Sequence, residues 1–92
     1  MADSKFFRNV PSAVWECVKT TSFKDHGTVY APPGALQGTA KTNTAVGEVI
    51  LNYDYNETDR TITYGIVKKP FIVGAGTIWD GIQSTIDGCS KS

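Results

Sequence analysis

Apolar and polar residues alternate along the second half of the chain in a pattern typical of β-strands. Two apolar runs make up one side of the pattern: Val49, Leu51, Tyr53 and Tyr55, then Ile62, Tyr64 and Ile66. The polar segment 56–60 separates them, and a connection of this length is typical of an antiparallel hairpin. The pattern predicts a β-hairpin from about Val46 to Lys69, closed by Pro70, which cannot donate a ladder hydrogen bond.

The spacing of apolar residues changes near the end of the chain. Isoleucines recur every four residues, at Ile78, Ile82 and Ile86. With Trp79 alongside, this spacing predicts a short amphipathic helix. A capping box from Thr77 to Asp80 predicts where the helix begins, and Gly88 is expected to end it. Gly81 costs about 1 kcal/mol relative to alanine inside a helix, so we interpret it as a site where another backbone approaches closely.

A second helix is predicted near the other end of the chain. Pro11 fits a first helical turn, and Val14 and Val18 then share one helix face beside Trp15. The β-branched content leaves a strand as the alternative. The helix is favoured because residues around Trp15 recur around Trp79 at a constant offset, which suggests two equivalent helices covering one sheet.

The middle of the chain, 26–47, is rich in glycine and proline and predicts mainly turns. Short strands are expected around Thr28–Tyr30 and Thr39–Thr44, because an isolated two-stranded hairpin is marginally stable in water. The fold prediction is therefore a single α+β domain spanning residues 1–92. It has an antiparallel sheet of three or four strands and a short helix near each chain end.

Charge and hydropathy narrow the classes of partner. Nine basic and nine acidic side chains leave no net charge to attract phosphate backbones or anionic lipid, so neither nucleic acid nor a membrane is an expected partner. No apolar stretch reaches the length of a membrane span. The first residues are polar and charged and carry no signal-peptide pattern, which predicts a cytoplasmic location.

Cysteine and histidine supply the only candidate reactive pair. Cys17 and Cys89 have neither zinc-site spacing nor the density of a disulfide scaffold, so free thiols are expected in a reducing cytosol. A Cys17–Cys89 bridge is the alternative under oxidising conditions, provided that the geometry is suitable. Cys17 with His26 is a possible thiolate–imidazole pair; the alternative is a buried cysteine and a solvated histidine. No motif predicts a metal or a cofactor.

The aromatic side chains are the candidate ligand-binding residues. Trp15 and Trp79 on the helices should face Tyr53 and Tyr64 on the hairpin, either as plain core or as the lining of an apolar slot with hydroxyl and indole donors. The leading interpretation is a non-enzymatic module that binds a small apolar or aromatic ligand or another protein. The alternatives are a reactive-thiol protein or enzyme using Cys17 with His26, and a structural subunit.

Self-association is expected in either non-enzymatic case. A small sheet leaves an edge with unpaired amides, so a homodimer is predicted, with the segment Thr39–Thr44 as its contact.

The segment Val10–Glu16 resembles the start of the first helix in the Bet v 1-like ligand-binding proteins. The likeness covers only this short segment, and 92 residues are too few for that family's large curved sheet and long terminal helix. What the resemblance implies is limited to support for ligand binding.

Overall fold

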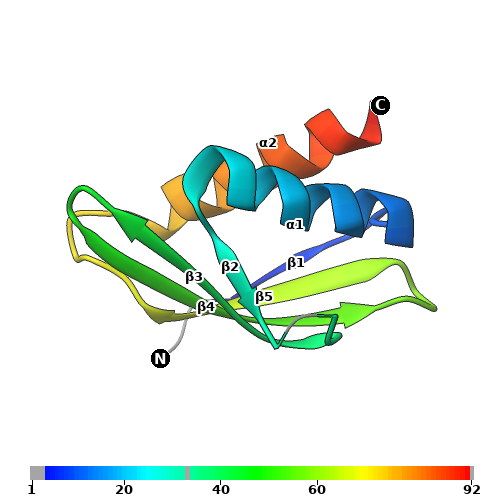
Figure 1. Cartoon of the computed structure of the whole chain (residues 1–92), viewed down its shortest axis with the longest axis horizontal. Helices are drawn as coiled ribbons and strands as arrows, with labels where there is room; N and C mark the ends of the chain where they lie inside the picture. The colour runs from blue at the N-terminus through cyan, green and yellow to red at the C-terminus, as the bar shows by residue number, and fades with distance from the viewer. Residues whose placement is uncertain (1–3, 33, 92) are drawn as a thin grey trace.

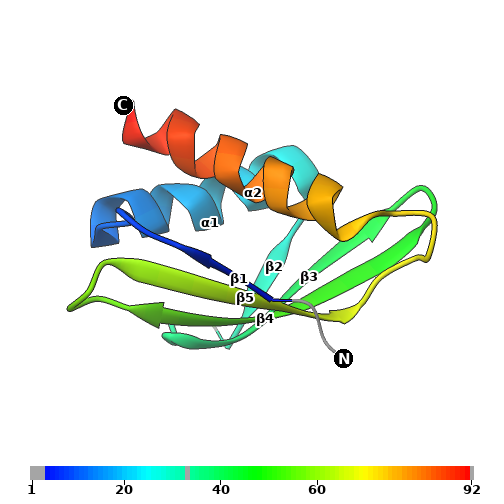
Figure 2. The ribbon, with the colours of Figure 1, turned by 180° about the vertical axis from the view of Figure 1, so that it is seen from behind.

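A five-stranded antiparallel sheet carries two helices on one face (Figures 1 and 2). This is a computed structural model, and it describes residues 4–32 and 34–91. The elements in chain order are β1 (Ser4–Phe7), α1 (Ser12–His26), β2 (Val29–Ala31), β3 (Gln37–Thr44), β4 (Gly47–Asn56), β5 (Thr61–Lys68) and α2 (Ala75–Ser90). The strand order is β1-β5-β4-β3-β2. The predicted α+β class is confirmed, with one strand more than the predicted upper number.

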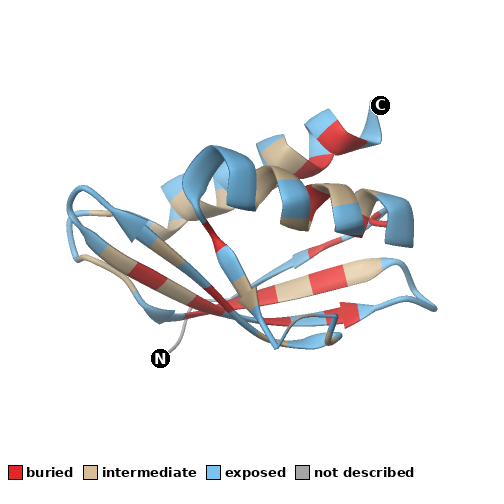
Figure 3. Cartoon of the chain, in the orientation of Figure 1, coloured by how far each residue is buried: buried red, intermediate tan, exposed pale blue. Residues whose placement is uncertain are grey.

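The predicted hairpin is present as β4 and β5, the centre of the sheet. Tyr53 pairs with Tyr64, and the two apolar runs identified in the sequence form the buried inner face. Buried residues alternate with more exposed ones along β4 and, at its start, along β5, where the alternate residues are intermediate (Figure 3). The period of two therefore predicted correctly which side of this hairpin the helices cover.

Strand β1 was not predicted from the sequence. Its four residues pair antiparallel with β5, and Phe7 is buried while the adjacent Phe6 is half exposed. Two neighbouring phenylalanines show no alternation over so short a segment, and the partner strand lies far along the chain. Val10 then donates its N–H to the carbonyl oxygen of Arg60 at 2.8 Å, which fixes the chain where it turns into α1.

The predicted edge of the sheet is wrong. The segment Thr39–Thr44 lies within β3, which is an inner strand, and its residues Thr39 to Lys41 pair with β2. The short strands expected around Thr28–Tyr30 and Thr39–Thr44 are both present. The first pairs with the second and leaves only the residues after Lys41 unpaired on that side. The edges of the sheet are β1 and β2 instead.

Both predicted helices are present. The first and last residues of α2 differ from those predicted. This helix begins at Ala75 and continues through Gly88 to Ser90, so Thr77 is inside the helix and caps nothing. The carbonyl oxygen of Gly74 accepts from the N–H of Thr77 and of Ile78, so backbone groups close the first turn. Neither helix, within the described chain, has the length and apolar character needed to cross a membrane.

A disulfide bond between Cys17 and Cys89 ties the two helices together. The expectation of free thiols is therefore wrong: the sulfurs meet although the cysteines are 72 positions apart, with their Cα atoms 5.9 Å apart. The hydroxyl of Thr21 lies 3.7 Å from the sulfur of Cys17 and 3.8 Å from that of Cys89. Sequence spacing alone could not reveal this pairing, because it depends on how the helices lie on the sheet.

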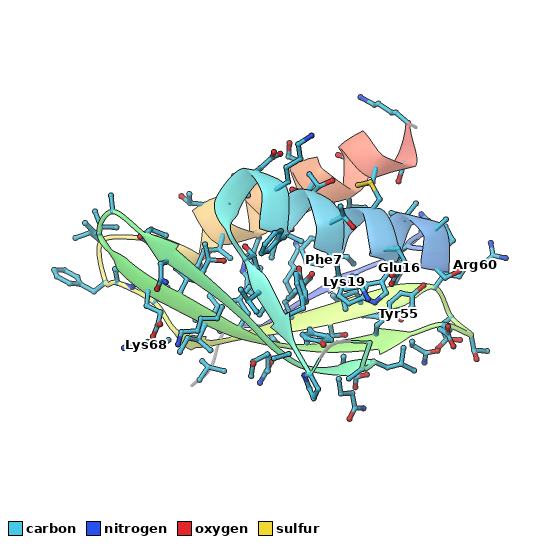
Figure 4. All side chains as sticks on the ribbon, viewed as in Figure 1. Phe7, Glu16, Lys19, Tyr55, Arg60 and Lys68 are labelled. Atoms are coloured by element: carbon cyan, nitrogen blue, oxygen red, sulfur yellow. A yellow bond between two sulfur atoms is a disulfide. The ribbon has the colours of Figure 1, made fainter. Side chains whose placement is uncertain are left out.

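The Trp15 ring packs between α1 and the sheet near this disulfide. It stacks on Tyr55 with ring centroids 5.1 Å apart and meets Tyr30 edge-on at 5.4 Å. The hydroxyl of Tyr55 donates to the carbonyl oxygen of Val10 at 2.7 Å. Lys19 extends over the Trp15 ring at 5.3 Å from its centroid and pairs with Glu16 at 2.6 Å (Figure 4). Large aromatic side chains thus fill this end of the interior.

Replacing both cysteines, Cys17→Ser with Cys89→Ser, should lower the free energy of unfolding by about 4 kcal/mol, because the bridge closes a long loop in the unfolded chain. Urea denaturation followed by tryptophan fluorescence measures the loss. Reducing the unmodified protein with a thiol should give the same shift in midpoint. An unchanged midpoint in both cases would show that no bond joins these sulfurs.

Candidate functional site

A cavity of about 290 Å³ lies between the two helices and the sheet. Apolar side chains from both layers line it, including Val18, Val49, Leu51, Ile78 and Ile82. The helix residues in its lining come after Cys17 in α1 and before Cys89 in α2. The cavity therefore occupies the half of the helix pair that extends away from the disulfide.

Small side chains on the inner face of β3 leave this space unfilled. Alternate residues of the strand share that face, and here they are Gly38, Ala40, Thr42 and Thr44. The last three line the cavity, and their strand neighbours include Leu51 and Val49 of β4. The small side chains on this face of β3 leave the gap to the helices open, whereas Trp15 and Tyr55 fill it at the other end.

Helix α2 presents a matching stripe of small residues to the cavity. Thr77, Gly81 and Thr85 follow one another at four-residue spacing, and all three line the cavity beside Ile78 and Ile82. No atom lies within 4 Å of where a Cβ of Gly81 would be. The interpretation of Gly81 as a site of close backbone approach is therefore wrong; the glycine faces open space at the middle of the stripe.

Two tyrosines in the cavity lining are hydrogen-bonded to each other. The hydroxyl oxygens of Tyr30 and Tyr64 lie 2.8 Å apart in a hydrogen bond. Burial raises the pKa of Tyr64 well above its ordinary value of 10.0, and the neighbouring Tyr30 adds to the rise. Burial also raises the pKa of Tyr30, although hydrogen bonds with Tyr64 and Ser22 oppose the change. Both phenols stay protonated at neutral pH and act as neutral hydrogen-bonding groups.

The polar part of the lining carries hydroxyl groups and almost no charge. Thr28 and Thr42 share a hydrogen bond of 2.6 Å, and both line the cavity with the tyrosine pair. Among the described residues that line it, His26 is the only side chain able to carry a positive charge, and no carboxylate is present. His26 is exposed at the end of α1, so a charged ligand group placed beside the hydroxyls would be buried without a counter-charge, which costs several kcal/mol, whereas hydroxyl or carbonyl groups find partners.

The predicted ligand-binding residues divide between this cavity and the filled core. Tyr64 lines the cavity, whereas Trp15, Trp79 and Tyr53 do not. Tyr53 donates its hydroxyl to the carbonyl oxygen of Ala35 at 3.2 Å. Trp79 meets Phe7 edge-on at 6.4 Å and is partly buried. These three side chains hold the helices against the sheet.

Several lining residues went unnoticed in the sequence, Tyr30 and Thr42 among them. A usable signal exists: the inner face of β3 carries no large apolar side chain, and α2 carries Thr77, Gly81 and Thr85 at one helical spacing. Small residues on two facing surfaces predict space between them. Recognising this requires knowing that β3 and α2 face each other, which local patterns do not provide.

The structure does not bring Cys17 and His26 together. Cys17 is bonded to Cys89, and His26 is exposed at the far end of α1, about 13 Å along the helix axis at 1.5 Å per residue. The described residues also include no cluster of three or more histidine, cysteine or acidic side chains placed to hold a metal ion.

Comparison with known proteins assigns no relationship. No family model, no curated protein and no solved structure matches the chain at a significant level. The short resemblance of Val10–Glu16 to the Bet v 1-like proteins is therefore not supported as a family assignment. The site must be interpreted from its own geometry.

Stability should fall as pH rises above about 10, because tyrosines ionise in the unfolded chain while the raised pKa values keep Tyr30 and Tyr64 protonated in the fold. The native state then binds more protons, and each such tyrosine contributes a slope of about 1.4 kcal/mol per pH unit. Tyr64→Phe should flatten this alkaline decline in urea titrations between about pH 9 and about pH 11. Parallel declines in the two proteins would contradict the assignment.

Proposed function

We propose that the protein binds one small, neutral, amphiphilic molecule in the cavity between its helices and sheet. The observation that carries the proposal is the lining itself: a space of about 290 Å³ with apolar walls, clustered hydroxyl groups and no carboxylate. This combination of a mainly apolar surface with a few convergent polar groups is typical of small-molecule sites.

The volume restricts the size of the ligand. Pockets for drug-sized molecules occupy about 300 to 1,000 Å³, so a cavity of about 290 Å³ is at the lower end of that range. A single-ring aromatic alcohol or a medium-chain alkyl alcohol or ketone has suitable dimensions. A full phospholipid does not fit within it.

The distribution of polar groups suggests how such a ligand lies. Hydroxyl groups of Tyr30, Tyr64, Thr28 and Thr42 come from the sheet side and the segment leading into β2. Ile78, Ile82 and Val73 provide apolar surface from α2 and the segment before it. The ligand's oxygen therefore points toward the sheet hydroxyls while its hydrocarbon part packs beneath α2.

Binding is a better-supported role than catalysis. The two buried tyrosines have raised pKa values, so they donate hydrogen bonds at neutral pH but do not act as bases. His26, the remaining ionisable group of the lining, is exposed. The reactive-thiol alternative has less support, because Cys17 is held in the disulfide.

The disulfide also bears on location. Bonds of this kind persist in oxidising compartments and are rare in the cytosol. The link between Cys17 and Cys89 joins the helices over the core, as a structural bridge does. We therefore propose that the protein works in an oxidising environment, in place of the cytoplasmic location predicted from the sequence.

The predicted homodimer has no part in this proposal. The edge strands β1 and β2 have four and three residues, and short edges are one way in which proteins discourage sheet-to-sheet pairing. Self-association remains a prediction from the sequence, and any edge contact would use β1, β2 or the end of β3 beyond Lys41.

Gly81→Leu should weaken binding of the neutral fluorescent probe N-phenyl-1-naphthylamine at least tenfold, because the new side chain would occupy open space next to the lining residue that it replaces. The fold should be retained, since leucine favours a helix over glycine by roughly 0.8 kcal/mol. Gly76→Leu is the matched control: the same helix and the same substitution, with open space around it but outside the lining. Probe fluorescence titrations compare the three proteins. Equal affinities would rule out this cavity as the binding site.

The absence of a buried counter-charge among the described lining residues predicts that 1-decanol displaces the probe more effectively than decanoate does at neutral pH. The two share a chain length and differ in charge, so the comparison isolates the cost of burying a carboxylate. We expect at least a tenfold difference in competing concentration. Stronger competition by decanoate would contradict the neutral-ligand proposal while leaving the site in place.

A further inference from the structure

A tight turn between β5 and α2 exposes two large apolar side chains. The N–H of Val73 donates to the carbonyl oxygen of Pro70 at 3.0 Å, so Phe71 and Ile72 occupy the corner of the turn. Phe71 is 92% exposed and Ile72 is 66% exposed. Phe7 precedes Phe71 by 64 positions, the same offset that separates Trp15 from Trp79. Phe7 is buried in β1, so the two phenylalanines have different roles.

Folding does not account for these two residues. Turn corners favour glycine, proline, asparagine, aspartate and serine, and exposed large apolar groups that gather in one place mark interaction surfaces. Val46, in the turn between β3 and β4, is 52% exposed, and Val67, at the end of β5, is 59% exposed. We call Val46, Val67, Phe71 and Ile72 together the apolar tip.

The two turns of the apolar tip are held side by side. The Pro70 ring packs against Gly47 so closely that a Cβ there would lie 2.8 Å from the ring, and the φ of Gly47 is 139°, which only glycine adopts readily. Figures 1 and 2 show the β3–β4 turn and the segment after β5 next to each other at one end of the molecule. The exposed apolar side chains therefore form one projecting surface.

Lysines outnumber carboxylates beside the apolar tip, although the whole chain is neutral. Lys68 and Lys69 follow Val67 directly, and Lys41 comes from β3. Glu48 is 3.0 Å from the Lys41 ammonium and 3.7 Å from that of Lys68, which lies at this end in Figure 4. One carboxylate thus faces two lysines. Among the described residues, no carboxylate is within ion-pair distance of Lys69.

We propose that the apolar tip docks on a membrane surface that contains anionic lipids. Phe71 and Ile72 enter the boundary between headgroups and acyl chains, and the lysines contact the headgroup phosphates. A narrow projecting turn with flanking lysines suits a lipid interface, which accepts side chains at any lateral position. The expectation of no membrane partner rested on net charge, which does not describe this local distribution.

The position of the apolar tip connects it with the cavity. Val73, the last residue of the exposed turn, lines the cavity, and so does Thr44, the last residue of β3. Docking here would place the cavity next to the lipid phase, where a poorly soluble amphiphile is concentrated. This connection rests on the proposed function, whereas docking itself rests only on the surface residues.

The test is sedimentation of the oxidised, full-length protein with vesicles of phosphatidylcholine, with and without phosphatidylserine. The unmodified protein should bind the anionic vesicles, and Phe71→Ser with Ile72→Ser should weaken binding at least tenfold. Phe6→Ser with Leu36→Ser is the matched control, because it removes similar apolar surface that is 50% and 46% exposed elsewhere. Lys68→Gln with Lys69→Gln should reduce binding to anionic vesicles by roughly fivefold for each lysine and raise its resistance to salt.

Docking through the apolar tip is supported if the Phe6 and Leu36 control variant binds vesicles as well as the unmodified protein does, while the Phe71 and Ile72 variant loses binding. Equal binding of both pairs, or no vesicle binding by the unmodified protein, overturns it. A dimer in sedimentation that the Phe71 and Ile72 pair converts to monomer would also overturn it, because a second copy would then cover this surface. None of these outcomes depends on the probe titrations, so failure here leaves the ligand proposal to be judged separately.

Discussion

The contact between the disulfide-linked helices and the Trp15 ring beneath them determines how the layers of this protein lie. The bridge between Cys17 and Cys89 joins the helices at one end of the layer, and there Trp15 stacks on Tyr55 of the sheet. Helices are stiff, so the separation set by large aromatic rings extends along their length. Where the inner residues of β3 and α2 become small, the same separation leaves a space of about 290 Å³. The cavity thus results from a difference in side-chain size: large aromatic rings set the distance between helices and sheet at one end, and the small residues at the other end do not fill it.

The chemistry of the cavity follows from what can be buried beside hydroxyl groups. Tyr30 and Tyr64 share one hydrogen bond, as do Thr28 and Thr42, so each of these hydroxyl oxygens has a partner without a ligand, and the accepting member of each pair keeps an O–H that can donate to one. Removing charge from such a space avoids the desolvation cost of ions. Under the proposed function, the same feature favours neutral molecules, and docking of the apolar tip on a membrane would place the cavity beside a source of them.

The sequence predicted the elements whose patterns are long and local. The central hairpin and both helices were correctly identified, because their periods extend over several residues of one segment. Strand β1 was missed, since Phe6 and Phe7 do not alternate and its partner β5 is distant. The prediction that Thr39–Thr44 forms an edge was wrong for its first half, because only the fold shows that β2 returns to pair with Thr39 to Lys41.

The site was less predictable than the fold for a related reason. Aromatic content pointed to Trp15, Trp79 and Tyr53, which are large enough to fill the space they occupy. A cavity forms instead where small residues from distant segments line the same space, as Gly81 and Thr42 do here. The disulfide could not be decided from the sequence for the same reason, because it joins segments at the two ends of the chain. Each of these features depends on tertiary placement.

The most direct test of the account is to locate a bound neutral amphiphile by NMR. In the protein saturated with 1-decanol, intermolecular nuclear Overhauser effects should connect the alkyl chain with the methyl groups of Val49, Ile78 and Ile82, all of which line the cavity. The aromatic protons of Trp15 and Tyr55, in the filled core, should show none. Contacts confined to Trp15 and Tyr55, or to surface residues outside the cavity, would contradict the account.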